Sequence, residues 1–215
     1  ELRDFVIEGK DPWQYVKDIL EDKQRSPMKY LDSINKAKLR WRSFGNKPVR
    51  QELLDTLVRF ELTSEQIRRV MDVDERKKSG IAATDEELIA NPYLICESDL
   101  GSAKSDPISL DTIDRGMLPE GNFSHILSAS EQITKDDSRR VRAVATTVLK
   151  EAAECGDTLL SLSELFEKIR SRFPKRRECK PDREVFEAEA EFHQQLLWLS
   201  FDEEPNLAAL RNLRD

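Results

Sequence analysis

The chain has 215 residues, of which 36% are charged and 38% hydrophobic, and its formal net charge at pH 7 is −7. The length allows one large or two small domains, and this balance of charged and apolar residues is typical of a mainly helical protein. Seven glycines are too few for an all-β fold full of tight turns, and the negative net charge argues against a generally basic nucleic-acid-binding protein.

The sequence shows no sign of a membrane span or of a secretion signal. No apolar run approaches the roughly 18 residues that cross a bilayer, and the first ten residues lack the apolar core of a signal peptide. The cysteines Cys96, Cys155 and Cys179 are far apart and odd in number, which argues against disulfides and a Cys-x-x-Cys metal clip. We therefore expect a cytoplasmic protein with reduced core thiols, no metal and no membrane partner.

Apolar residues at helical spacing predict a series of short helices in the first half of the chain. Pro12 stands at a helix start, and Thr63 and Thr84 each begin a capping box with Gln or Glu three residues later. The helix after Thr84 must stop before Pro92, because the residue before a proline disfavours helical geometry. The predicted helices lie at residues 12–20, 26–45, 49–60, 63–71 and 84–91, with a further one at 108–115 closed by Gly116.

Residues 33–51 hold six cations and no acid, interleaved with Trp41 and Phe44. Cations beside aromatic rings are typical of surfaces that hold a nucleic-acid backbone and stack its bases. The alternative is a helix in which Tyr30 or Leu31 and Trp41 point into the core while the cations face solvent. The nucleic-acid-binding candidates of this segment are Lys36, Lys38, Arg40, Trp41, Arg42, Lys47 and Arg50.

Residues 137–159 predict a long helix with one apolar face. Asp137 or Ser138 is a plausible N-cap, and Gly156 is well placed for the left-handed turn that ends a helix. Three arginines near its N-terminus oppose the helix dipole, which indicates a partner such as a phosphate or an acidic neighbour. The simplest acidic neighbour is the segment 184–204. These candidate residues are Arg139, Arg140 and Arg142.

The last part of the chain predicts a small helical unit that ends in a hairpin. Ser161 begins a capping box, a basic loop follows Pro174, and residues 182–194 predict a helix with one inward face. Residues 196–201 suit a strand, and residues 207–213 suit its partner strand or a terminal helix. Helices followed by a hairpin is the order of a winged helix, whose loops often contact phosphates. The candidates in the loop are Lys175, Arg176 and Arg177.

These elements together predict a mainly α fold in two parts. Residues 1–130 are expected to form a bundle of helical hairpins, and residues 131–215 the long helix plus the winged-helix-like unit. Charge alternates coarsely along the second part: residues 168–183 carry eight cations and two acids, whereas residues 184–210 carry seven acids and no cation. Such alternation is also expected where basic and acidic stretches face each other.

No catalytic motif is present. The chain has no Walker A loop, and His125 and His193 are too few and too isolated for a zinc site or a hydrolytic triad. Acidic pairs such as Asp136-Asp137 are more typical of caps and turns than of an active site. We therefore expect no enzymatic activity and no cofactor in this chain itself.

A set of motifs nevertheless resembles a known family. The chain contains Asn91-Pro92-Tyr93, then a short Asp-Arg segment, then D-x-R-R-V-R-A at 137–143, a long helix and E-A-A-x-x-G at 151–156. This order resembles the region upstream of the ATPase core in RecD-like DNA helicases, specifically over residues 53–97 and 137–165. The resemblance implies a parent protein that uses ATP and Mg²⁺ to move 5′ to 3′ on DNA, with motor domains beyond residue 215. This region would dock on those motor domains and help to guide DNA.

The sequence departs from the family where a helix-hairpin-helix turn is expected. Such a turn binds phosphate through backbone amides in a Gly-x-Gly stretch, but residues 107–116 read PISLDTIDRG and lack those glycines. The departure predicts a supporting rather than a DNA-gripping hairpin. Two other interpretations stay open: a protein-interaction or scaffold domain that contacts another subunit without touching DNA, and a winged-helix DNA-binding regulator, against which the acidic helix at 182–194 argues.

Overall fold

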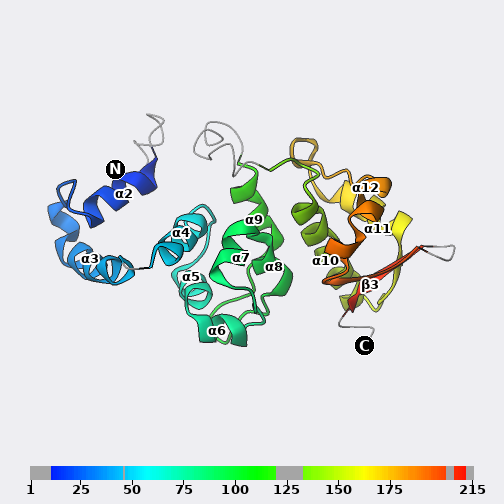
Figure 1. Cartoon of the computed structure of the whole chain (residues 1–215), viewed down its shortest axis with the longest axis horizontal. Helices are drawn as coiled ribbons and strands as arrows, with labels where there is room; N and C mark the ends of the chain where they lie inside the picture. The colour runs from blue at the N-terminus through cyan, green and yellow to red at the C-terminus, as the bar shows by residue number, and fades with distance from the viewer. Residues whose placement is uncertain (1–10, 46, 120–132, 202–205, 212–215) are drawn as a thin grey trace.

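The computed structural model describes residues 11–45, 47–119, 133–201 and 206–211. The described chain is mainly helical with one small antiparallel sheet, as the sequence predicts. Figure 1 shows α2 (Pro12–Leu20) and α3 (Leu31–Phe44) at one end of the long axis, and the sheet with its helices at the other. The predicted boundary at residues 130/131 lies outside the described residues.

The first helices begin where the sequence places their caps. The Asp11 side chain accepts the Trp13 amide at the start of α2, and the Thr63–Gln66 capping box opens α5. The segment predicted as one helix from residue 26 instead contains a short 3₁₀ turn before α3, and both Tyr30 and Leu31 are exposed rather than inward. This part comprises η1 (Met28–Tyr30), α4 (Pro48–Leu57) and α5 (Ser64–Met71).

Four short helices follow, two of which the sequence did not predict. They are α6 (Val73–Lys78), α7 (Asp85–Ala90), α8 (Tyr93–Ser98) and α9 (Leu110–Met117). The capping box at Thr84 and the stop before Pro92 are both confirmed. The expectation that Gly116 closes its helix is wrong, because Gly116 lies inside α9. A Cβ at Gly116 would meet the Phe60 ring and the Arg59 carbonyl oxygen, so the glycine permits close helix packing.

The second half is built around α10 (Ser138–Glu154). Asp137 caps this helix, and Gly156 ends it with a φ of 98°, both as predicted. The capping box at Ser161 opens α11, also as predicted. The elements after α10 are β1 (Leu160–Ser161), α11 (Leu162–Arg172), η3 (Lys175–Arg177), α12 (Arg183–Ala188), α13 (Ala190–His193), β2 (Leu197–Ser200) and β3 (Leu207–Leu210).

The sheet has the strand order β1-β3-β2, with both pairs antiparallel. The hairpin of β2 and β3 confirms the strand reading of both segments, and Leu199 faces Ala208 across it. The prediction of a single helix at 182–194 is wrong in detail, because the helix is interrupted at Glu189, which separates α12 from α13. Phe186 points inward as expected, but Val185 is 52% exposed.

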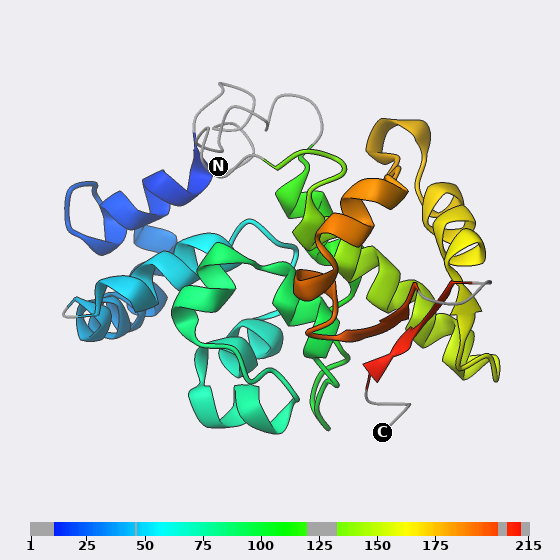
Figure 2. The same ribbon diagram turned by 45° about the vertical axis from the view of Figure 1, so that its right-hand side comes forward.

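One hydrophobic core extends from α4 to β3, with α10 at its centre. α10 packs against α8, α9, α11 and β3, and it buries Val141, Val144 and Leu149. The buried residues of the α2–α3 hairpin are not part of this core, although Phe44 at the end of α3 packs against it. Within the hairpin the Trp13 ring meets the Trp41 ring edge-on at 6.1 Å. Figure 2 shows this hairpin standing apart from the α10 unit.

Candidate functional site

A buried carboxylate, Asp114 of α9, joins the motifs of the central region. Arg140 of α10 donates two hydrogen bonds to it, from Nε at 2.6 Å and from a terminal nitrogen at 3.1 Å. The Tyr93 hydroxyl of α8 donates a third, at 2.8 Å. All three side chains are fully or almost fully buried. Burial beside this carboxylate raises the pKa of Tyr93, so the hydroxyl keeps its proton and acts as a donor.

The same network reaches the basic loop after α11. Arg140 also donates to the Lys135 carbonyl at 2.5 Å and to the Arg177 carbonyl at 2.7 Å. Its guanidinium lies over the Phe173 ring, 4.7 Å from the centroid. Arg177 in turn lies 3.4 Å from the Asp114 carboxylate. Arg140 therefore makes four hydrogen bonds inside the protein and links α10 to α9, to η3 and to the segment before α10.

A second buried ion pair, Arg142 with Glu97, connects α10 and α8 to the C-terminal unit, which we define as residues 160–211. Arg142 donates two hydrogen bonds of 2.9 Å to Glu97, one to each carboxylate oxygen. It also reaches the Phe192 carbonyl at 3.1 Å and the Gln195 side chain at 2.9 Å, and its guanidinium lies over the Phe192 ring. Burial raises the pKa of Glu97, although the hydrogen bonds from Arg142 oppose this shift. Lys150 adds a bond to the Glu97 carbonyl.

The three arginines of α10 are thus bound within the chain. Arg139 pairs with the cap residue Asp137 at 2.8 Å and donates to the Ala90 carbonyl. The expectation of an acidic neighbour holds, but its predicted identity is wrong. The carboxylates come from α9, α8 and the helix cap, whereas the segment 184–204 contributes a carbonyl and an amide oxygen to Arg142. Arg140 and Arg142 are buried, which leaves them no surface for a phosphate.

The loop between α8 and α9, which leads into the segment PISLDTIDRG at 107–116, is closed by Asp99. Its carboxylate accepts the Gly101 amide at 3.1 Å and the Ile108 amide at 2.7 Å. The Arg69 guanidinium pairs with it at 2.5 Å, and the Arg69 and Asp99 side chains are almost completely buried. A carboxylate of the chain itself therefore binds these two backbone amides.

The basic segment of α3 is partly neutralised. Lys38 and Arg42 both pair with Asp22, at 2.6 and 2.9 Å, and these bonds lower the pKa of that carboxyl. Trp41 is only 8% exposed and packs on Trp13, so the core interpretation of its ring is the one the structure supports. Arg50 is half-buried and pairs with Asp85 at 2.8 Å.

Arg76 also pairs with the Asp85 carboxylate, at 2.6 Å. Burial alone would raise the pKa of Asp85, but the bonds from Arg50 and Arg76 outweigh it, and the pKa is lowered. The predicted residues that are exposed in this segment are Lys36, Arg40, Arg42 and Lys47. Arg42 pairs with Asp22, whereas Lys36, Arg40 and Lys47 form no ion pair with another described residue.

The basic loop after α11 forms the 3₁₀ turn η3. Lys175 and Arg176 are exposed, whereas Arg177 is half-buried against Asp114. Of the predicted residues, the structure leaves exposed Lys36, Arg40, Arg42, Lys47, Lys175 and Arg176, half-buries Lys38, Arg50, Arg139 and Arg177, and buries Trp41, Arg140 and Arg142. No local pattern in the sequence pairs Asp114, Glu97 and Asp99 with their arginines, because those arginines lie 26 to 45 residues away.

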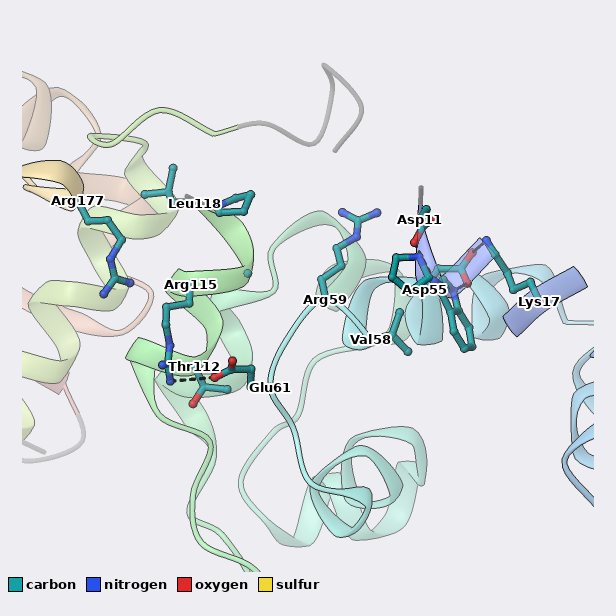
Figure 3. A pocket seen from close by; sticks show the side chains of 14 residues that line it. Asp11, Lys17, Asp55, Val58, Arg59, Glu61, Thr112, Arg115, Leu118 and Arg177 are labelled. Carbon is teal, nitrogen blue, oxygen red and sulfur yellow. Dashed lines mark hydrogen bonds and ion pairs between the residues drawn. The ribbon is translucent and has the colours of Figure 1, made fainter. Parts of the chain in front are cut away.

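A cleft of about 760 Å³ opens between α2, the end of α4 and the end of α9, as Figure 3 shows. Charged residues that line the cleft pair with one another. Asp55 accepts a hydrogen bond from the Trp13 indole at 2.6 Å and pairs with Lys17, and Arg115 pairs with Glu61 at 3.3 Å. The residues lining the cleft are Asp11, Pro12, Trp13, Lys17, Asp55, Val58, Arg59, Glu61, Thr112, Arg115, Gly116, Leu118, Pro119 and Arg177.

Within the described part of the chain, no group of three or more His, Cys, Asp or Glu side chains is placed to hold a metal ion. The same residues contain no helix long and apolar enough to cross a membrane. Cys96 and Cys179 are buried thiols as expected, and burial raises the pKa of Cys179 to about 12, whereas Cys155 is exposed. Comparisons with protein-family models, curated proteins and solved structures found no match.

Proposed function

We propose that this chain is the N-terminal, non-motor region of a RecD-like ATP-dependent DNA helicase, and that it works as a rigid docking unit for the motor domains. The observation that carries the proposal is the convergence on Asp114. Tyr93 from the N-P-Y motif and Arg140 from the D-x-R-R-V-R-A motif both bind this carboxylate, which itself belongs to the Asp-Arg segment. The three sequence features behind the resemblance therefore serve one physical purpose.

The C-terminal unit supports a docking role. Its order after α10 is β1, α11, η3, α12, α13 and the β2–β3 hairpin, with strand order β1-β3-β2, and we propose that this arrangement is winged-helix-like. The helix that would enter a DNA groove in such a unit is α12, whose exposed Glu184 would repel phosphate. We propose that this unit contacts protein, and that ATP and Mg²⁺ act in the motor domains alone.

The structure of the predicted DNA-binding features also favours docking. Asp99 binds two backbone amides of the loop before α9, Arg140 and Arg142 are buried, and Trp41 offers no ring for a base to stack on. The remaining support for direct DNA contact, our second candidate function, is that Lys36, Arg40 and Lys47 are exposed and form no ion pair with another described residue.

Two experiments test the docking proposal. The gene of the parent protein should encode a Walker A motif within roughly a hundred residues after Asp215, and its absence would remove the assignment. The 215-residue chain should bind the separately produced motor segment in a calorimetric titration. No detectable binding with motor segment at about 100 μM would contradict a docking role while leaving the helicase assignment intact.

A further inference from the structure

Eight large apolar side chains are exposed among the described residues, and four of them lie on η1 and α3, whereas Val73, Leu100, Leu159 and Val185 are spread over the rest of the chain. Met28 is 91% exposed, Leu39 67% and Leu31 45%, and all three lie on η1 or α3. Exposed apolar residues gathered in one place, unlike scattered ones, indicate a surface that another molecule covers. Lys36 and Arg40 lie on the same helix and are exposed, and Asp32 is the single acid of α3. We name Met28, Leu31, Leu39, Lys36 and Arg40 the basic end.

Another exposed apolar residue, Val185, lies on α12, and its charged neighbours that are exposed include acids rather than only cations. Val185 is 52% exposed, and its neighbours Glu184 and Ala188 are also exposed. Glu191 of α13 adds a further exposed carboxylate, whereas Glu187 pairs with Arg183 on the same helix. We name Glu184, Val185, Ala188 and Glu191 the acidic end.

The two ends cannot meet within one molecule. Figure 1 places α3 and α12 toward opposite ends of the long axis, and the turned view in Figure 2 keeps them apart. The exposed cations of α3 and the exposed acids of α12 and α13 therefore do not pair with each other within one molecule (Figure 1). Each end combines exposed apolar area with charges that form no ion pair with another described residue, and the charges of the two ends are of opposite sign.

We propose that the chain associates head to tail, with the basic end of one copy docking on the acidic end of a second copy. Leu39 and Met28 would cover Val185, while Lys36 and Arg40 would face Glu184 and Glu191. Such a contact joins two different surfaces, so it leaves a free end on each side of a dimer and allows further copies to add. This inference goes beyond the proposed docking on a motor and does not depend on it.

The association is expected to be weak. The faces come from a 14-residue helix and a six-residue helix, so they are small, and interfaces below about 1,200 Å² are typical of transient contacts. Opposite charges across it contribute orientation and speed of encounter more than affinity. Salt at about 1 M shortens the screening length to roughly 3 Å and should abolish the charge contribution.

Sedimentation equilibrium without DNA tests the proposal. The average mass should rise above the monomer value of 24.9 kDa as the chain is concentrated at low salt, and it should return to that value at high salt. Two charge-reversed variants give the decisive comparison: Lys36→Glu with Arg40→Glu, and Glu184→Lys with Glu191→Lys. Each alone should remain monomeric, because both of its ends then carry the same sign.

An equimolar mixture of the two variants should associate again, because the reversed basic end of one complements the reversed acidic end of the other. Restoration on mixing cannot come from misfolding, since two unfolded variants would not rescue each other. Replacing Leu39 and Met28 by Ser should weaken the association with all charges kept. Glu86→Lys with Glu154→Lys, two exposed acids on α7 and α10, is the matched control and should associate like the parent chain.

A parent chain that stays monomeric at every concentration and salt would overturn the proposal. So would association that persists in both charge-reversed variants alone, or a mixture of them that stays monomeric. Since Lys36 and Arg40 are also the candidate DNA contacts, the DNA measurements are made at concentrations where the chain is monomeric. Failure of self-association then leaves the helicase assignment and the DNA test unaffected.

Discussion

The hydroxyl of Tyr93 and the guanidinium of Arg140 both donate to one oxygen of Asp114, at 2.8 and 2.6 Å. The carboxylate thus receives hydrogen bonds from two helices that flank its own, and no part of it is exposed to solvent. A buried charge is tolerable only with such partners, so the geometry of α8, α9 and α10 depends on this contact.

Removing the charge of Asp114 should destabilise the protein strongly. In Asp114→Asn, Arg140 becomes a buried cation without a counter-ion, which costs about 3–5 kcal/mol of unfolding free energy. Tyr93→Phe deletes one hydrogen bond and should cost about 1–3 kcal/mol. Urea denaturation followed by circular dichroism measures both. The exposed neighbour Asp111→Asn is the control, and a loss at Asp114 no larger than that of the control would contradict the prediction.

Arg142 and Glu97 should show a pairwise effect. Arg142→Met leaves a buried carboxylate, so we expect a loss of about 3–5 kcal/mol, and Glu97→Leu should cost a similar amount. The double variant should recover much of this loss, because two apolar side chains can replace a buried ion pair at little net cost. A double-mutant cycle from denaturation curves gives the coupling energy. Additive losses would show that the two side chains act independently.

Stability should fall in mild acid because of His193. This side chain is buried, neither ring nitrogen has a hydrogen-bond partner among the described residues, and burial lowers its pKa from 6.5 to about 4. Between these two values the unfolded chain binds a proton that the folded chain does not, so stability decreases as the pH falls through that window. The full effect is on the order of 3 kcal/mol.

His193→Phe provides the control for this pH dependence, because the imidazole is stacked on the Phe186 ring at 4.1 Å and another ring can take its place. The variant should lose less stability than the parent between pH 6.5 and about 4, while the carboxylates titrate alike in both. Identical pH profiles of the two proteins, measured by thermal melting, would show that His193 is not the titrating group.

Gly116→Ala should destabilise the contact between α9 and the end of α4. The added methyl group would meet the Phe60 ring and lie 2.8 Å from the Arg59 carbonyl oxygen, which forces a shift costing about 1–3 kcal/mol. Gly156→Ala offers a contrast, because nothing lies within 4 Å of its Cβ and the cost comes from a φ of 98° alone. Adding Phe60→Leu should relieve Gly116→Ala and leave Gly156→Ala unchanged, which thermal melting can decide.

If the exposed cations bind DNA, the salt dependence of binding will show it. Replacing Lys36, Arg40 and Lys47 by Ala should weaken binding to single-stranded and forked DNA equally across sequences. It should flatten the plot of log K against log salt by roughly two to three units, since each phosphate contact releases counter-ions. Lys77, Lys78 and Lys104, also exposed, form the matched control triple. Equal slopes for the two triples would assign DNA contact to the motor domains alone.

The sequence predicted the elements whose signals are local. The predictions of capping boxes at Thr63, Thr84 and Ser161 are confirmed, because each box depends on residues only three positions apart. The six-residue α8 and the two-residue β1 were missed, since neither is long enough to show a periodic pattern.

The ion pairs could not be predicted, because they depend on packing between distant segments. The arginines of α10 signalled an anionic partner through the helix dipole, but nothing local distinguishes Asp114 and Glu97 from the many other acids of the chain. Trp41 shows the same limit: a tryptophan among cations reads equally as a stacking surface or as core, and only its contact with Trp13 decides.

The backbone amides of Gly101 and Ile108 bind a carboxylate of the same chain, that of Asp99. Because the carboxylate is covalently tethered to the amides it binds, its effective concentration at that position is far above that of any dissolved phosphate, typically millimolar or higher for short tethers. A DNA phosphate would have to displace it and leave Arg69 to find a new partner. As long as Asp99 and Arg69 stay paired, the Gly101 and Ile108 amides are therefore occupied from within the chain.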